Sequence, residues 1–235
     1  MTLHLKVRLH DEGPALWPSY IPLTELDDWK RGVGTPIFET MWQGRRGGLA
    51  GKLVKPEWIR YFRGWPPGTT FMAVDPAISE KTSADETGIV VGNASYDEPS
   101  RIYIRFVHHA RMGLRDTAET IAKIAGYYRP VAIGIEAVAY QTALVQFVES
   151  EYPTLPIEPV KPDRDKVSRI LGLAALYEYG RVLHHPDMRA SAYEWQLTHV
   201  PDAKHDDMVD AACYLAQMAG ISIAGLSGDR PEGMR

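Results

Sequence analysis

Residues 205–211 carry three carboxylates within five residues and begin an otherwise apolar run that reaches about Gly220. On a helix, Asp207 and Asp210 are three residues apart, so their carboxylates share one face and can bind one cation together. Asp206 and Asp210 are four apart and could also converge. Like charges this close destabilise a helix unless something positive lies among them, although the helix N-terminus relieves part of the repulsion. The stretch is therefore either part of a metal site or an acidic cap on a surface helix.

Two further acids end apolar runs that are predicted to be buried strands. Residues 71–75 end in Asp75, with Pro76 next, and residues 131–136 end in Glu136. In open α/β sheets the functional residues gather where the central strands end. A buried carboxylate costs several kcal/mol unless it finds a cation or another partner. If the two strands are parallel neighbours, Asp75 and Glu136 lie side by side.

Adding the helix acids gives four carboxylates around one point: Asp75, Glu136, Asp207 and Asp210. No cluster of His or Cys accompanies them in the sequence, and an all-oxygen ligand set selects Mg²⁺ or Mn²⁺ rather than zinc. Two such ions about 4 Å apart would activate a water and stabilise the leaving oxygen of a phosphodiester.

Each acid has a simpler interpretation when it is taken alone. Asp75 before Pro76 could begin a turn, Glu136 could pair with a surface Arg, and the helix acids could only cap their helix. All three interpretations would have to hold together, in this order and on these elements. The combination therefore favours metal-dependent phosphodiester hydrolysis.

From about Thr70 the chain alternates strands and helices, which implies one mixed sheet flanked by helices. The pattern predicts three antiparallel strands, over residues 71–75, 88–94 and 101–109. Next come a helix at 114–128, a strand at 131–136, a helix at 141–151, a strand at 157–160 and a helix at 165–180. Short extended pieces at 181–184 and 194–200 precede the final helix.

Residues 1–66 differ from the rest because Gly and Pro interrupt any long periodic element. They predict only a short helix at 24–31 and a helical turn at 36–43. We interpret residues 1–66 as a linker or the tail of a preceding domain, residues 67–222 as the main domain, and residues 223–235 as a flexible tail.

The net charge of −4 over 235 residues gives no global signal for nucleic acid or membrane. DNA binding would have to rest on a local basic patch. The single Cys213 excludes an internal disulfide framework and a Cys-rich zinc site. The sequence has no signal-peptide core and no run of about 18 apolar residues, which predicts a soluble cytoplasmic protein.

A candidate basic patch lies in the loop and helix start that follow the strand at 157–160. Its members are Lys161, Arg164, Lys166 and Arg169. Lys166 and Arg169 are three residues apart and face the same way on a helix, so they could neutralise DNA phosphates. Because Asp163 and Asp165 lie among these basic residues, the alternative remains that the segment is an ordinary, solvated helix start of mixed charge.

Four segments, in this order, resemble the nuclease domain of phage terminase large subunits. They are residues 71–77, 85–91, 133–136 and 205–211. That domain has the ribonuclease H-like fold shared with Holliday-junction resolvases, a mixed β-sheet of three antiparallel strands plus parallel strands flanked by helices. The resemblance covers about residues 15–220, and its front part is similar to the segment that joins the terminase motor to its nuclease.

By this resemblance Asp75, Glu136 and Asp207 would be the catalytic, metal-binding triad. Asp210 resembles the last acid of the resolvase pattern, and Asp206 is the least preferred ligand. In the resulting hypothesis Asp75 bridges two ions, Glu136 holds one of them, and Asp207 with Asp210 holds the other.

Two residues form a second tier of site candidates. Asp85 lies where the family often has an acid near the site, as a ligand or a neighbour of one. His205, beside the acids, could orient an acid or touch the scissile phosphate.

The resemblance implies an endonuclease that cleaves double-stranded DNA during viral genome packaging, with Mg²⁺ or Mn²⁺ and two ions expected. It also implies a portal protein, a small terminase subunit and an ATPase motor domain as partners, in the cytoplasm of the infected host cell and without a membrane. The sequence lacks the Gly-x-x-x-x-Gly-Lys-Ser/Thr loop that cradles phosphates, so no ATP site is expected in this chain.

Two alternatives are kept. One is a Holliday-junction resolvase or transposase-like nuclease of the same fold. The other is a non-catalytic module that docks on packaging-motor subunits through the aromatic-rich front segment.

Overall fold

The computed structural model describes residues 22–41, 52–77, 86–98, 101–137, 142–203 and 205–221. The second-tier candidate Asp85 lies outside the described residues.

The described strands form one seven-stranded mixed sheet in the order β1-β7-β4-β3-β2-β5-β6. Strands β2, β3 and β4 are antiparallel neighbours, whereas β5, β6, β7 and β1 join through parallel pairings. Their bounds are β1 Arg60–Tyr61, β2 Gly68–Asp75, β3 Thr87–Ser95, β4 Ile102–Ala110, β5 Ala132–Glu136, β6 Ile157–Val160 and β7 Val182–His184. The predicted mixed sheet of antiparallel and parallel strands is confirmed.

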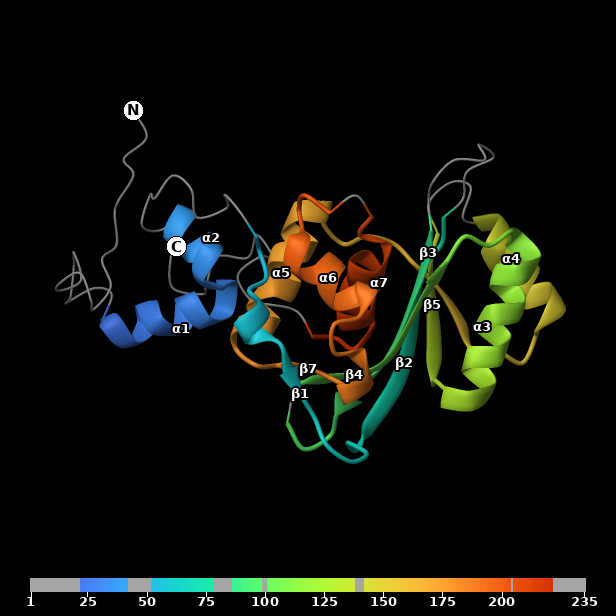
Figure 1. The fold of residues 1–235 in the computed structure, drawn as a ribbon, viewed down its shortest axis with the longest axis horizontal. Coiled ribbons are helices and arrows are strands. Elements are labelled where there is room, and N and C mark those ends of the chain that lie inside the picture. The colour runs from blue at the N-terminus through green and yellow to red at the C-terminus, as the bar shows by residue number, and fades with distance from the viewer. Residues whose placement is uncertain are drawn as a thin grey trace, which may run out of the picture.

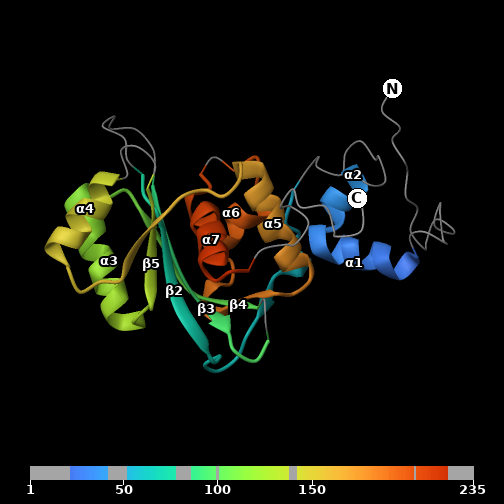
Figure 2. The same cartoon turned by 180° about the vertical axis from the view of Figure 1, so that it is seen from behind.

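Helices cover both faces of the sheet. Their bounds are α1 Leu23–Val33, α2 Thr35–Met41, α3 Leu114–Tyr128, α4 Thr142–Glu151, α5 Lys166–Glu178, α6 Ala192–His199 and α7 Asp207–Met218. Figure 1 shows α3 and α4 on one face and α5, α6 and α7 on the other, with α1 and α2 beyond α5. The view from behind in Figure 2 shows the same layers. None of the described helices combines the length and the apolar character that a membrane span requires.

Residues 72–74 of β2 and 132–135 of β5 are apolar at every position because both faces of these strands are buried. In β2, Met72 and Val74 face the core under α3 and α4, whereas Ala73 faces the core under α5 and α7. All three side chains are fully buried. This alternation explains why the strand reads as a continuous apolar run rather than as an amphipathic one. The core under α5 and α7 also takes in Leu26 of α1 and Phe38 of α2, so the front helices pack on the same layer.

Helix α7 lies unusually close to the sheet at both of its ends. A Cβ atom on Gly88 of β3 would lie 2.5 Å from the carbonyl oxygen of Asp207, where α7 begins. A Cβ on Gly134 of β5 would clash with the Met218 sulfur, where α7 ends. Gly88 is also the residue paired with Asp75 across β2 and β3. The two glycines therefore allow α7 to begin directly beside the end of β2.

The prediction of an extended piece at residues 194–200 is wrong, because residues 194–199 belong to helix α6 and Val200 caps its end. Ser191 caps the start of the helix, since its hydroxyl accepts a hydrogen bond from the Glu194 N–H at 3.3 Å. Tyr193 and Leu197 are buried one helical turn apart. The cap and the four-residue spacing are helical signals that the short polar segment concealed.

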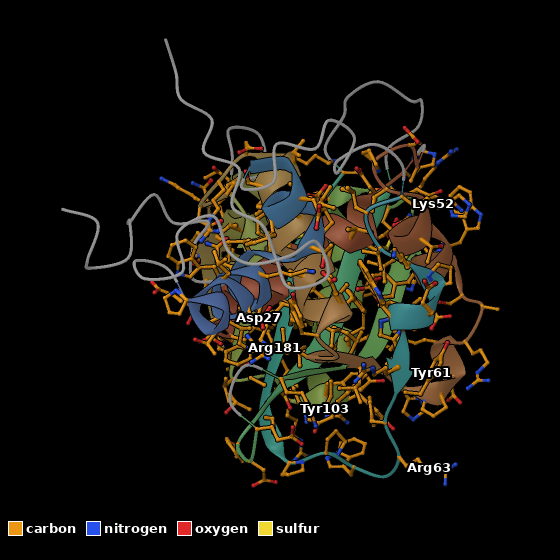
Figure 3. The ribbon with its side chains drawn as sticks, turned by 90° about the vertical axis from the view of Figure 1, so that its left-hand side faces the viewer. Asp27, Lys52, Tyr61, Arg63, Tyr103 and Arg181 are labelled. Atoms are coloured by element: carbon orange, nitrogen blue, oxygen red, sulfur yellow. The ribbon has the colours of Figure 1, made fainter. Side chains whose placement is uncertain are left out.

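A buried polar network fixes α6 against the edge of the sheet. Glu194 Oε1 accepts a hydrogen bond from Tyr61 of β1 at 2.8 Å and lies 2.9 Å from His184 Nδ1. Tyr61 is labelled in Figure 3. His184 Nε2 lies 2.7 Å from the Tyr177 hydroxyl. His184 and Tyr177 are fully buried, and buried polar groups are tolerated when they are paired in this way.

Substitution Gly88→Ala will test the close packing of α7 on strand β3. The added Cβ would clash with the backbone at Asp207, so we expect a loss of about 1–3 kcal/mol in the free energy of unfolding. Urea unfolding measures it. Gly126→Ala is the matched control, because a Cβ there meets no described atom within 4 Å in helix α3. We expect that control to be neutral or stabilising by up to about 1 kcal/mol. Equal effects of the two substitutions would contradict the claim that α7 packs too closely on Gly88 to admit a Cβ atom.

Candidate active site

Asp75 and Glu136 are the last residues of adjacent parallel strands, so both lie at the end of the sheet where these strands finish. Asp75 is the last residue of β2 and Glu136 the last of β5, and Val74 is paired with Ile135 immediately before them. The nearby carboxyl group of Glu136 contributes to raising the pKa of Asp75. Two carboxyl groups this close favour the state in which one of them carries a proton. The structure thus brings these two predicted site residues together.

The pKa of Asp75 shows that more than two acids meet at this point. Burial raises the pKa of Asp75 well above its ordinary value, and the hydrogen bond with Glu136 raises it further. The negative charges of Asp210, Glu136 and Asp207 act in the same direction. The charges of the other three acids expected from the sequence therefore all act on Asp75.

The start of α7 is not an ordinary acidic cap. Asp206 occupies the N-cap position, but its side chain makes no capping hydrogen bond within the described residues. Asp207 and Asp210 lie in the first turn, and Asp210 is only 5% exposed. The cap interpretation of Asp206 is therefore not supported, and Asp210 is a buried acid that needs partners of its own.

Two predicted DNA-binding residues supply those partners. Lys166 Nζ lies 2.7 Å from Asp206 Oδ2 and 2.7 Å from Asp210 Oδ2. Arg169 Nη2 lies 3.0 Å from Asp210 Oδ1. Burial alone would lower the pKa of Lys166, but its hydrogen bonds to the two acids raise it. The structure thus joins two predicted phosphate contacts to two predicted metal ligands, across helices α5 and α7.

Tyr214 is a site residue that sequence reasoning missed. Its hydroxyl donates a hydrogen bond to Glu136 Oε1 at 2.5 Å, and the Arg169 guanidinium lies 4.7 Å from the centre of its ring. Burial and the bond to Glu136 raise the pKa of Tyr214, so the hydroxyl stays a donor. Tyr214 follows Asp207 by two helical turns, and that spacing was the signal that could have found it.

The other two predicted DNA-binding residues lie at the flank of the acids. Glu136 is paired with Val160, so Lys161, the next residue, emerges at the same edge of the sheet. Lys161 is exposed, whereas Arg164 is partly buried and its Nε lies 3.4 Å from Asp163 Oδ2. Of the two, Lys161 presents the more accessible positive charge.

His205 belongs to a second group on the opposite flank. The hydrogen bond from His109 lowers the pKa of Glu86 against the effect of burial, and the charges of His109, His205 and Arg111 add to it. His109 is paired with Gly88, which places this group at the same edge of β3 and β4 as the acids. Sequence reasoning named His205 but not Glu86, His109 or Arg111.

The donor chemistry of the central acids fits a hard divalent cation. Among the described residues, no three or more His, Cys, Asp or Glu side chains stand in an arrangement that could bind a metal ion as they are. Asp75, Glu136 and Asp207 nevertheless offer only carboxylate oxygens, and burial together with the negative charges of the neighbouring acids raises the pKa of Asp75. Both features suit Mg²⁺ or Mn²⁺.

Comparison with known proteins gives a consistent family and fold. A family model described as the terminase RNaseH-like domain matches residues 72–219. A comparison with curated protein sequences gave no significant match. The sequence identities to the similar solved structures are 12% or less, so these structures establish the fold alone.

Three solved structures illustrate the similarity. A large terminase from a thermophilic bacteriophage has a TM-score of 0.59 at 10% identity, over 83% of this chain and 51% of that one. The human cytomegalovirus terminase nuclease domain has a TM-score of 0.52 at 12% identity, over 70% and 94%. The large terminase nuclease from thermophilic phage G20c has 0.50 at 12%, over 68% and 94%. The chain thus spans about half of the first protein and nearly all of the two nuclease domains.

Metal-free protein will show the raised pKa of Asp75 in its pH dependence. In the unfolded chain Asp75 releases its proton near pH 3.9, about the usual value for Asp, whereas the folded state keeps the proton to a higher pH. The stabilisation by protonated Asp75 is therefore fully present below about pH 3.9 and is lost as the pH rises through the folded pKa. Asp75→Asn removes this pH dependence. We expect the variant to gain stability relative to wild type as the pH rises from about 4, by up to about 1.4 kcal/mol per pH unit.

Urea unfolding in EDTA at several pH values measures this difference. Asp97→Asn is the control, because Asp97 is exposed beyond β3 at the other end of the sheet. Parallel pH profiles for wild type and Asp75→Asn would contradict the prediction.

Proposed function

Because this chain belongs to the family of terminase RNaseH-like domains, we propose that it is a divalent-metal-dependent endonuclease that cleaves double-stranded DNA during viral genome packaging. The observation that carries the proposal is the convergence of Asp75, Glu136 and the start of α7 at one edge of the sheet. Such a cluster of acids is a poor structural choice unless a cation joins it.

In this proposal Asp75, Glu136 and Asp207 hold the metal, as Mg²⁺ or Mn²⁺, with two ions expected. Two solved G20c nuclease structures contain bound cobalt and bound magnesium, respectively. When bound, such ions supply an activated water and stabilise the leaving oxygen of a phosphodiester.

The chain's own residues prepare this site in three ways. Tyr214 donates to Glu136 and so orients its carboxylate. The raised pKa of Asp75 favours a proton on its carboxyl group, and a divalent cation that binds there would release that proton. Lys161 and Arg164, which follow β6 beside Glu136, are proposed to contact DNA phosphates and hold the duplex over the acids.

The proposed setting follows from the family as well. We propose that the chain works with an ATPase motor, a portal protein and a small terminase subunit in the cytoplasm of the infected host cell. The large terminase with the TM-score of 0.59 is about twice as long as the part that this chain matches, which agrees with a motor supplied outside these residues.

Substitutions Asp75→Asn and Asp207→Asn will test catalysis. Each removes one carboxylate from the proposed metal set, so we expect at least about 100-fold slower plasmid cleavage in Mn²⁺, with the fold retained by circular dichroism. Asp97→Asn, far from the site, should cleave at the wild-type rate. Wild-type activity in Asp75→Asn would exclude the proposed mechanism.

The same assay separates the alternative functions. Wild-type protein that cuts a four-way junction in preference to linear duplex would favour a resolvase. Wild-type protein that binds without metal and never cleaves would favour a docking module.

Substitutions Lys161→Ala and Arg164→Ala will test the DNA-binding flank. Each is expected to weaken duplex binding roughly 3- to 10-fold and to lower the slope of log affinity against log salt by about one. Fluorescence anisotropy with a labelled duplex, in Ca²⁺ to prevent cleavage, measures both quantities. Lys123→Ala on α3 is the control, because Lys123 is exposed and paired with Glu119 on the other face of the sheet. An unchanged salt slope in both variants would place the DNA elsewhere.

A further inference from the structure

Four charged residues form a clamp between the starts of α5 and α7. They are Lys166 and Arg169 of α5, and Asp206 and Asp210 at the start of α7. The side chains of Asp210 and Arg169 are 7% and 10% exposed, whereas Lys166 is 48% exposed. The clamp is therefore anchored in the interior and has one solvent-accessible cation at its outer end.

We propose that Lys166 is a resident cation of the active site, which takes the place between Asp206 and Asp210 that a metal ion would otherwise take. Asp207 is then the acid of α7 that binds metal. The inference rests on the proposed function, because it assigns the acids of the same metal site. It departs from the expectation that Asp210 is itself a ligand.

The distances show that three of the four oxygens of the clamp acids contact Lys166. Lys166 Nζ contacts both oxygens of Asp206, at 2.7 and 2.8 Å, and Oδ2 of Asp210 at 2.7 Å. Arg169 Nη2 lies 3.0 Å from the remaining oxygen of Asp210, as an ion pair without a hydrogen bond. An ammonium is a compact point charge with three donors, so it can bridge two carboxylates as a metal ion does. A metal ion that used Asp210 would have to displace one or both of these cations.

Burial explains why the clamp needs tethered cations. Burial raises the pKa of Asp210, and Lys166 and Arg169 oppose that rise. Removing one partner of a buried pair leaves an uncompensated charge, which is strongly destabilising. Asp210 also acts on Asp75 through space, so neutralising it reduces the negative charge that the metal site must absorb. Lys166 thus acts as a positioning residue that fixes the start of α7 and limits how many divalent ions the acids accept.

Lys166→Met, Asp210→Asn and the double variant will test the clamp in the absence of DNA. In EDTA, each single variant leaves the four-residue clamp with one excess charge and should lower the unfolding midpoint by about 5 °C. The double variant has the wild-type net charge and should recover most of that loss. Losses that simply add in the double variant would overturn the clamp. Lys161→Met, which removes an exposed Lys nearby, is the control and should leave the midpoint unchanged.

Mn²⁺ binding tests whether Lys166 occupies a metal position or only stabilises the fold. It is measured by calorimetry and by the rise in the unfolding midpoint that Mn²⁺ causes. Lys166→Met should bind one further Mn²⁺ ion, because the vacated pair of acids accepts it. The double variant should bind Mn²⁺ with an affinity within about threefold of wild type, since its remaining acids keep their places. Wild-type Mn²⁺ stoichiometry in Lys166→Met, or loss of Mn²⁺ binding in the double variant, would overturn the proposal.

The outcomes distinguish this inference from the proposed function. Wild-type protein that binds no Mn²⁺ and cleaves no DNA would remove the proposed nuclease. Non-additive stability changes in EDTA, together with Mn²⁺ binding gained by Lys166→Met, would still support the clamp.

Discussion

The close packing of α7 on the sheet is the constraint on which the candidate site depends. Asp207 begins the helix directly over Gly88, which is paired with Asp75, and Met218 ends it over Gly134 in β5. The helix therefore crosses the central strands at close range, with its first turn beside the strand ends. A side chain at either glycine would lift the helix and separate its acids from those of the sheet. The geometry of the candidate site thus depends on the absence of two Cβ atoms as much as on the presence of the carboxylates.

The start of α7 is also held from the side. The Met208 N–H donates a hydrogen bond to Gln196 Oε1 of α6 at 3.3 Å. Helix α6 is in turn fixed by the buried contact between Glu194 and His184, which reaches Tyr177 of α5. A network of satisfied buried polar groups specifies one arrangement, since any shift would leave a polar group unpaired. This support explains how a helix that begins with three acids keeps a defined position.

The sequence predicted the parts of the site that depend on the strands. Continuous apolar runs that end in Asp75 and Glu136 indicated two buried strands, because burial on both faces leaves a clear pattern. The sequence left open whether these strands are neighbours, and the structure pairs them. The pairing of Lys166 with Asp210 could not be predicted in this way. A basic residue on a helix start is attracted equally to a DNA phosphate and to a carboxylate, and only the packing of α5 on α7 decides between them. Helix α6 was missed because its apolar face is short.

The repulsion among the candidate site acids is reduced in two different ways. Burial and the neighbouring acids raise the pKa of Asp75 and so favour a proton there, whereas Asp206 and Asp210 are paired with the side chain of Lys166. A proton leaves freely into water, but a side chain on a packed helix does not. In the proposed function a divalent cation would therefore enter more easily on the Asp75 side, where it would displace only a proton, than on the Asp210 side, where it would have to break buried ion pairs. The same difference would link metal binding to proton release, while the ion pairs of Lys166 hold the start of α7 in place without a metal.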